Sequence, residues 1–121
     1  MRLTETLAQE MWPFNVEINC VAPGFVITRL HQDTIAAGEK AGKAFLENTK
    51  RQIEAGGVSA TVGAGAAAFL ISDEAKGITG KFVAAPYDGW DRWGKHLKEL
   101  QGMDIFTLRR IVPKDRGMDW Q

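Results

Sequence analysis

The sequence predicts an α/β fold built around two strands of a parallel sheet. The first strand is expected at residues 16–22 (VEINCVA), where apolar and polar side chains alternate. The second is expected at residues 81–85 (KFVAA), and more than fifty residues of largely helical pattern separate the two. Strands joined by such a helical crossover lie parallel in α/β layer structures. Two parallel strands leave their edges and faces open, so we expect the sheet to be incomplete on its own.

The first twelve residues are expected to form a helix. Leu3, Leu7 and Met11 recur every four residues and place an apolar stripe on one face. Pro13 ends this helix, because the residue before a proline is pushed out of the helical region. No strand, cap or loop precedes the helix in the sequence, and we therefore expect the domain to be truncated at its start.

The segment at residues 29–57 is polar and rich in alanine, lysine and glutamate, which predicts one or two helices. The second of these helices is expected near residues 41–55. Its apolar anchors are expected to be Phe45, Leu46 and Ile53.

A further helix is expected to begin after Ser59, which is a good N-cap, and to run to about Ile71. Gly63 and Gly65 each cost about 1 kcal/mol of helix stability relative to alanine. Close packing against a neighbouring element would compensate for this cost. A dinucleotide-binding role is not favoured, because the two glycines lie inside a helix and not at a strand-to-helix turn.

Residues 89–121 are expected to be a C-terminal extension of the domain formed by residues 1–88. The extension begins with an apolar stripe at helical spacing, which predicts packing in a core or an interface, with an aromatic substrate wall as the alternative. The basic residues that follow are interspersed with acidic ones, which indicates a solvated surface. The stripe consists of Trp90, Trp93, Leu97 and Leu100.

The composition excludes several classes of function. The chain has 15 basic and 15 acidic residues and no long basic face, so nucleic acid is not expected as a partner. No apolar run approaches the roughly 20 residues of a membrane span, so no membrane association is expected. The single cysteine, Cys20, cannot form a disulfide within the chain, and a cytoplasmic location is the simplest setting. His31 and His96 lack partners at ligand spacing, so no metal site is expected.

The break after the first strand is the most informative stretch of the chain. Ligands of open α/β sheets bind beyond the carboxyl ends of the strands. Pro23 has no N–H and ends the strand, and Gly24 has no Cβ, which leaves room for a flat ring beside its backbone. Val26 offers backbone N–H and C=O groups, and Thr28 offers a hydroxyl. The alternative is an ordinary strand-ending turn, because Pro-Gly is common in turns.

Three pieces of sequence occur in a fixed order that carries a resemblance. They read Leu7-Ala8-x-Glu10, then Ile18-Asn19-x-Val21-Ala22-Pro23-Gly24-x-Val26-x-Thr28, and finally Ala67-Ala68-Phe69-Leu70-Ile71-Ser72-Asp73 followed by Ile78-Thr79-Gly80. Over residues 3–85 they resemble the second half of the short-chain dehydrogenase/reductase family.

This resemblance implies the C-terminal part of a Rossmann-like, doubly wound parallel sheet, and NAD or NADP as the cofactor of the complete enzyme. It implies that Pro23 and Gly24 face the nicotinamide ring. It also implies that Val26 bonds the carboxamide through its backbone, and that Thr28 contacts the carboxamide or a phosphate. Residues 29–57 would be the mobile substrate-binding loop, and the first helix would pack in a dimer interface.

The residues that this family uses in catalysis have no counterpart in the sequence. The glycine-rich phosphate loop and the catalytic serine, tyrosine and lysine are missing, and the one tyrosine, Tyr87, follows the second strand. We therefore assign no catalytic residue and expect the chain to be inactive alone. The complete enzyme would transfer a hydride between the nicotinamide and a small-molecule carbonyl or alcohol substrate. It would act as a homo-oligomer or with a chain that completes the sheet.

Two alternatives to this interpretation stay open. The first is a non-catalytic truncated module that dimerises with a full-length relative through the first helix. The second is a partial gene product with no role of its own.

Overall fold

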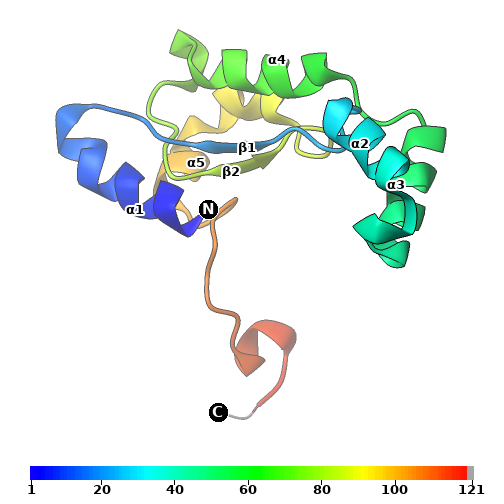
Figure 1. Cartoon of the computed structure of the whole chain (residues 1–121). Helices are drawn as coiled ribbons and strands as arrows, with labels where there is room; N and C mark the ends of the chain where they lie inside the picture. The colour runs from blue at the N-terminus through cyan, green and yellow to red at the C-terminus, as the bar shows by residue number, and fades with distance from the viewer. Residues whose placement is uncertain (120–121) are drawn as a thin grey trace.

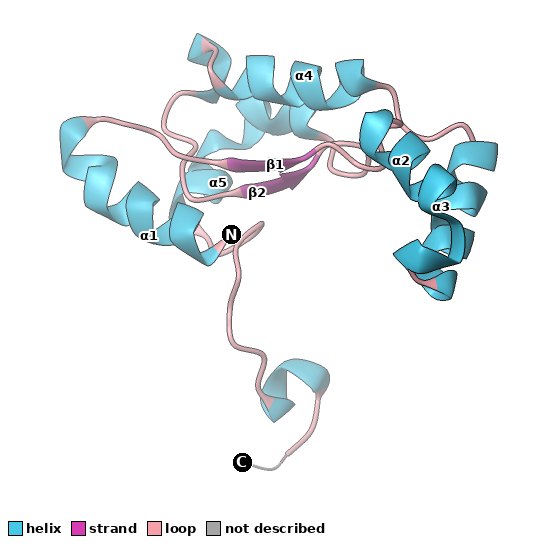
Figure 2. Cartoon of the chain, in the orientation of Figure 1, coloured by secondary structure: helices cyan, strands magenta, loops and turns pink. Residues whose placement is uncertain are grey.

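A two-stranded parallel sheet lies at the centre of the computed structural model, which describes residues 1–119 (Figure 1). Helices and short 3-10 turns account for most of the remaining secondary structure (Figure 2). In chain order the elements are α1 (Arg2–Met11), η1 (Trp12–Phe14), β1 (Cys20–Ala22), α2 (Arg29–Ala37), η2 (Gly38–Ala41), α3 (Lys43–Glu54), α4 (Ala60–Leu70), η3 (Asp73–Ala75), β2 (Phe82–Ala84), η4 (Trp90–His96), α5 (Leu97–Gly102) and η5 (Pro113–Arg116).

The two strands confirm the predicted parallel pairing, with Cys20 opposite Phe82 and Ala22 opposite Ala84. Each strand is three residues long, shorter than predicted. Before Cys20 the chain is held by side chains in addition to backbone bonds: Ile18 N–H donates to Thr79 Oγ1 (2.9 Å). Asn19 bonds the β2 side through both ends of its amide, to Ile78 O (2.7 Å) and from Lys81 N–H (3.0 Å). These side-chain bonds replace the regular ladder there, and the strand is accordingly short.

The helix α4 covers one face of the sheet, and α1 lies on the opposite side, beside the beginning of the strands (Figure 1). Ser59 caps α4 as predicted, because its side chain accepts a hydrogen bond from Thr61 N–H. The close packing predicted for the two glycines of α4 is confirmed, since Gly63 faces Pro23 and Gly65 faces the ring of Trp90. On the opposite face, Ala8 of α1 is buried.

The core joins α4 and β2 to the first part of the predicted extension. Its fully buried members include Ala66, Ile78 and Val83, and Trp93 and Leu100 belong to the same cluster. Core packing is therefore confirmed for the tryptophan and leucine stripe. Residues 90–100 share one core with the domain that precedes them.

Two helices, α2 and α3, lie beyond the carboxyl ends of the strands (Figure 1). The predicted anchor Leu46 is buried, but Phe45 is 55% exposed, and its assignment as an anchor is wrong. Its place is taken by Thr49, which lies one turn after Leu46 on the same face and is buried. Within residues 1–119, every helix falls short of the length and apolar character needed to cross a bilayer.

Candidate functional site

The loop that leaves β1 lies against the loop that leaves β2. Ala85 N–H donates to Ala22 O (2.9 Å), so the two strands end side by side. Gly24 has a φ of +82°, and a Cβ at this position would lie 2.7 Å from Pro86 Cγ and 3.0 Å from Val58 Cγ2. The chain thus requires glycine here for its own conformation and packing. Room for a flat ring, the reason inferred from the sequence, is not what the structure shows on this side of Gly24.

Backbone groups of Val26 differ in their availability. The N–H donates to Gly24 O (3.0 Å) and is therefore occupied, which differs from the sequence-based expectation that both groups are free. Within the described residues, no hydrogen bond reaches the Val26 carbonyl oxygen. Of the two backbone groups of Val26, only the carbonyl oxygen is open to a ligand.

Thr28 begins α2 and shares its polar groups with His31. The Thr28 N–H donates to His31 Nδ1 (3.1 Å), and Thr28 Oγ1 lies 3.2 Å from the same nitrogen. His31 thus takes the role that a glutamate or glutamine usually has in a capping box. Its ring also packs on Phe25, with centroids 4.3 Å apart. The Thr28 hydroxyl is exposed and stays within reach of a ligand.

The helical pair α2 and α3 is tied back to this loop. Val58 N–H, just after α3, donates to Phe25 O (2.8 Å). Leu30 and Ile35 of α2 and Phe45 of α3 are all exposed apolar side chains. The Thr49 hydroxyl is buried and has no hydrogen-bond partner among the described residues. Apolar surface therefore stands open next to the loop after β1.

Groups with the chemistry of a catalytic centre do not gather at this loop. Tyr87 is 84% exposed, and the residue four positions later is Asp91, so no Tyr-x-x-x-Lys arrangement exists there. Among residues 1–119, no group of three or more histidine, cysteine, aspartate or glutamate side chains is placed to hold a metal ion.

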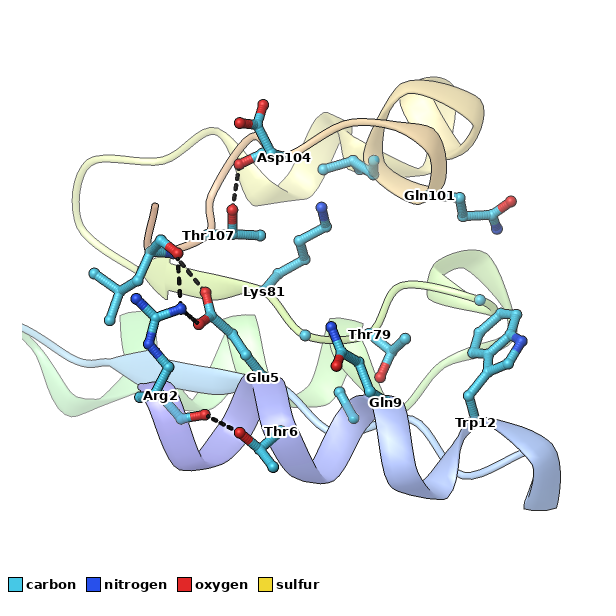
Figure 3. Close-up of a pocket in the computed structure, with 15 residues that line it drawn as sticks. Arg2, Glu5, Thr6, Gln9, Trp12, Thr79, Lys81, Gln101, Asp104 and Thr107 are labelled. Atoms are coloured by element: carbon cyan, nitrogen blue, oxygen red, sulfur yellow. Dashed lines mark hydrogen bonds and ion pairs between the residues drawn. The ribbon is translucent and has the colours of Figure 1, made fainter. Parts of the chain in front are cut away.

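A separate groove of about 580 Å³ lies at the other end of the sheet, where β2 begins (Figure 3). It runs between α1 and the segment after α5, and Trp12, Gln9, Thr79 and Gln101 are among its lining residues. Its lining includes none of the residues from Pro23 to Thr28. The groove and the loop after β1 are therefore distinct surfaces.

Comparison with known proteins assigns the family. Residues 1–86 match the sequence model of a family described as enoyl-(acyl carrier protein) reductase. The chain is also 36% identical over 81 residues to dehydrogenase/reductase SDR family member 4 of Sus scrofa, covering 67% of this chain and 28% of that protein. The chain belongs to the short-chain dehydrogenase/reductase family. The resemblance and the partial Rossmann-like sheet inferred from the sequence are thus confirmed.

Other short-chain dehydrogenases/reductases match over the same region. Tropinone reductase-like 3 of Erythroxylum coca is 43% identical over 83 residues, with 67% of this chain and 30% of that protein covered. NADPH-dependent reductase BacG of Bacillus subtilis (strain 168) is 30% identical over 87 residues, with 68% and 34% covered. This chain thus spans about a third or less of these relatives. No solved structure matches the chain.

Sequence reasoning missed several residues that shape the loop of this short-chain dehydrogenase/reductase. Pro86 and Val58 fill the space beside Gly24, and His31 caps α2. Asp88 accepts a hydrogen bond from Ala84 N–H (2.7 Å) and so fixes the exit of β2. The spacing of His31 three residues after Thr28 was the one available signal, because N3 is where a capping-box side chain sits.

Proposed function

We propose that this chain forms the C-terminal part of an NAD(P)-dependent oxidoreductase, with the loop from Pro23 to Thr28 facing the nicotinamide. The observation that carries the proposal is the position of this loop at the carboxyl end of a parallel strand, where α/β sheets bind their ligands. Membership of the short-chain dehydrogenase/reductase family agrees with this role.

The open groups of the loop fit the amide of a nicotinamide. The Val26 carbonyl would accept a hydrogen bond from the carboxamide NH2, and the exposed Thr28 hydroxyl would contact the carboxamide oxygen or a phosphate. The Val26 N–H takes no part, because Gly24 O already occupies it. NAD(P), when bound, supplies the carbon that accepts or donates the hydride. Residues of this chain orient the ring and exclude water from one side of it.

The pair α2 and α3 would supply the apolar cover over a small carbonyl or alcohol substrate. Leu30 and Phe45 are 68% and 55% exposed, respectively, which is costly unless another surface or a ligand covers them. Because Val58 N–H ties the end of α3 to Phe25 O, a movement of the cover would be transmitted to the loop.

Proton transfer would come from groups outside this sequence. The backbone edge of β1 supports this idea: Cys20 N–H donates to Lys81 O, and Ala22 O accepts from Ala85 N–H. Val21, between them, therefore directs its own N–H and C=O away from β2. That edge is unpaired in the described part of the chain and would receive a further parallel strand. The added segment would bring the catalytic tyrosine and lysine.

Titration of the isotope-labelled 121-residue chain with nicotinamide mononucleotide tests the role of the loop. We expect NMR shifts at Val26, Ile27 and Thr28, with Gly77 and Thr79 in the distant groove as internal controls. Shifts confined to the groove would contradict the proposed site. The chain alone should give no turnover of NAD(P)H with small ketones, whereas steady turnover would contradict the need for outside catalytic groups.

A second candidate function is that of a non-catalytic partner for a full-length relative. Leu3 and Phe14, in and just after α1, are 70% and 71% exposed, and Trp12 is also exposed. An apolar surface of this kind is typical of an interface. Co-purification with a complete short-chain dehydrogenase/reductase, lost on Leu3→Lys substitution, would support this function. A monomer that binds no such relative would contradict it.

A further inference from the structure

The two edges of the sheet differ in whether other parts of the chain cover their backbone groups. At the outer edge of β2, Phe82 N–H donates to Phe106 O (2.8 Å), and Ala84 N–H donates to Asp88 Oδ2 (2.7 Å). Both amides that a neighbouring strand would use are thus occupied. The far edge of β1, at Val21, has no such cover in the described residues.

Residues 103–108, which we name the strap, run along this outer edge of β2. Lys81 holds one half of the strap: its Nζ donates to Met103 O (2.8 Å) and Ile105 O (3.1 Å). Phe106 packs on Trp93 with centroids 4.5 Å apart. Phe106 also has a φ of 57°, which is uncommon for a residue other than glycine and is kept only where the surroundings fix it. The strap is therefore docked in one specific conformation.

The other end of the strap is held by α1. Arg2 donates to Leu108 O (3.1 Å), and Glu5 accepts from Leu108 N–H (Figure 3). Arg2 and Glu5 also form an ion pair of 2.9 Å. Two oppositely charged side chains thus bind both backbone groups of one residue, as a neighbouring strand would do.

Lys81 has an unusual environment for a lysine. Its residue is only 4% exposed, although lysine is almost never buried without a partner. Within the described residues no carboxylate lies at ion-pair distance, and its hydrogen-bond partners are the two strap carbonyls. Burying an ammonium group is costly unless its donors are bonded, so the lysine and the strap depend on each other.

We propose that the strap is a latch, fastened by Lys81 and by the Arg2–Glu5 pair, that closes the outer edge of β2. A bare strand edge pairs readily with other chains, and natural proteins cover such edges. The latch keeps this edge of β2 from pairing with another chain. This inference does not depend on which cofactor or substrate the protein uses.

Hydrogen exchange on the full chain tests the latch. Lys81→Met removes the amine and keeps an apolar stem, and Lys98→Met on the exposed face of α5 is the matched control. We expect the Phe82 amide to exchange about tenfold faster in Lys81→Met, as the loss of bonds to a charged group predicts. The Cys20 amide, which bonds to Lys81 O between the strands, should keep its rate in both variants. The control should leave Phe82 unchanged.

Two results would overturn the latch. One is an unchanged exchange rate at Phe82 in Lys81→Met, and the other is an equal acceleration at Phe82 and Cys20, which would indicate general loosening. If Lys81→Met yields no folded chain, the Arg2→Gln/Glu5→Gln double variant is used to test the latch. It releases the other end of the strap, and faster exchange at Phe82 is again expected. An unchanged rate in that variant would exclude the latch.

Discussion

Pro23 and Gly63 lie in direct contact, with no room for a side chain between them. A Cβ on Gly63 would lie 2.7 Å from Pro23 Cβ and 3.2 Å from Pro23 Cα. The glycine of α4 therefore sets how closely the helix approaches the loop after β1. The position of the proposed nicotinamide-facing loop is thus fixed by a residue that never touches a ligand itself.

Gly63→Ala should destabilise the fold despite its gain in helix propensity. The propensity gain is about 1 kcal/mol, whereas overpacking against a backbone that cannot retreat costs about 1–3 kcal/mol. We expect a net loss in the free energy of unfolding, measured by urea denaturation. Gly65→Ala is the matched control, because its nearest neighbour is the edge of the Trp90 ring at 3.0 Å, which can shift. A stabilised Gly63→Ala variant would show that α4 and the loop are not in contact.

Gly24→Ala should cost more stability than Gly42→Ala. Both glycines have positive φ, +82° and +93°, but a Cβ on Gly24 meets Pro86 and Val58 whereas one on Gly42 meets nothing within 4 Å. A positive φ strains alanine at both positions, and the ψ of 122° at Gly42 adds to the strain there. A loss at Gly24 that still exceeds the loss at Gly42, measured in urea, would therefore report the contacts with Pro86 and Val58. Equal losses of stability in the two variants would mean that Gly24 is not packed against Pro86 and Val58.

Asp88→Ala should weaken the exit of β2, because the carboxylate accepts the Ala84 N–H at 2.7 Å. Hydrogen bonds to charged groups contribute about 1.5–3 kcal/mol, and we expect a loss in that range. Asp88→Asn keeps an acceptor oxygen and should lose less. Thermal unfolding of the three proteins checks the order. An alanine variant as stable as the wild type would mean that this hydrogen bond contributes nothing.

The stability contribution of Lys81 should rise with pH. Burial lowers the pKa of Lys81 below its ordinary 10.5, and the nearby Asp104 partly opposes the shift. Between the lowered pKa and 10.5, the unfolded chain binds more protons at this group than the folded chain, so stability increases with pH in that window. The free energy of unfolding of the wild type minus that of Lys81→Met should therefore increase from neutral pH toward 10.5.

Lys98→Met, at an exposed lysine, is the control for removal of a lysine as such. A wild-type advantage over Lys81→Met that shrinks with rising pH would mean that the folded state raises the pKa of Lys81 instead. The direction of the slope thus distinguishes a desolvated amine from one held by a carboxylate.

Features with a local signature were predictable from the sequence. Ser59 precedes an apolar run and caps α4. The glycines at 63 and 65 lie inside a helix, which predicted close packing against a neighbouring element. The parallel order of β1 and β2 followed from the length of the helical segment between them. Each of these predictions depends on residues that are near one another in sequence or on a regular spacing of residue types.

Features made by single contacts between distant residues were not predictable. Nothing in the sequence links Gly24 to Pro86, and nothing marks the buried amine of Lys81 as a partner of Met103 and Ile105. Bonds from side chains to distant backbone groups have no period and no fixed spacing. For the same reason the sequence suggested two open backbone groups at Val26, whereas the loop uses one of them itself.

The hydrogen bonds between α1 and Leu108 have a consequence for biosynthesis. Arg2 and Leu108 are 106 positions apart, so this contact forms only after synthesis of the chain has passed Leu108. Until then the outer edge of β2 is uncovered and can pair with other chains. Slow elongation of the segment before Leu108 would lengthen that interval, and the yield of correctly folded protein would depend on how quickly this segment emerges.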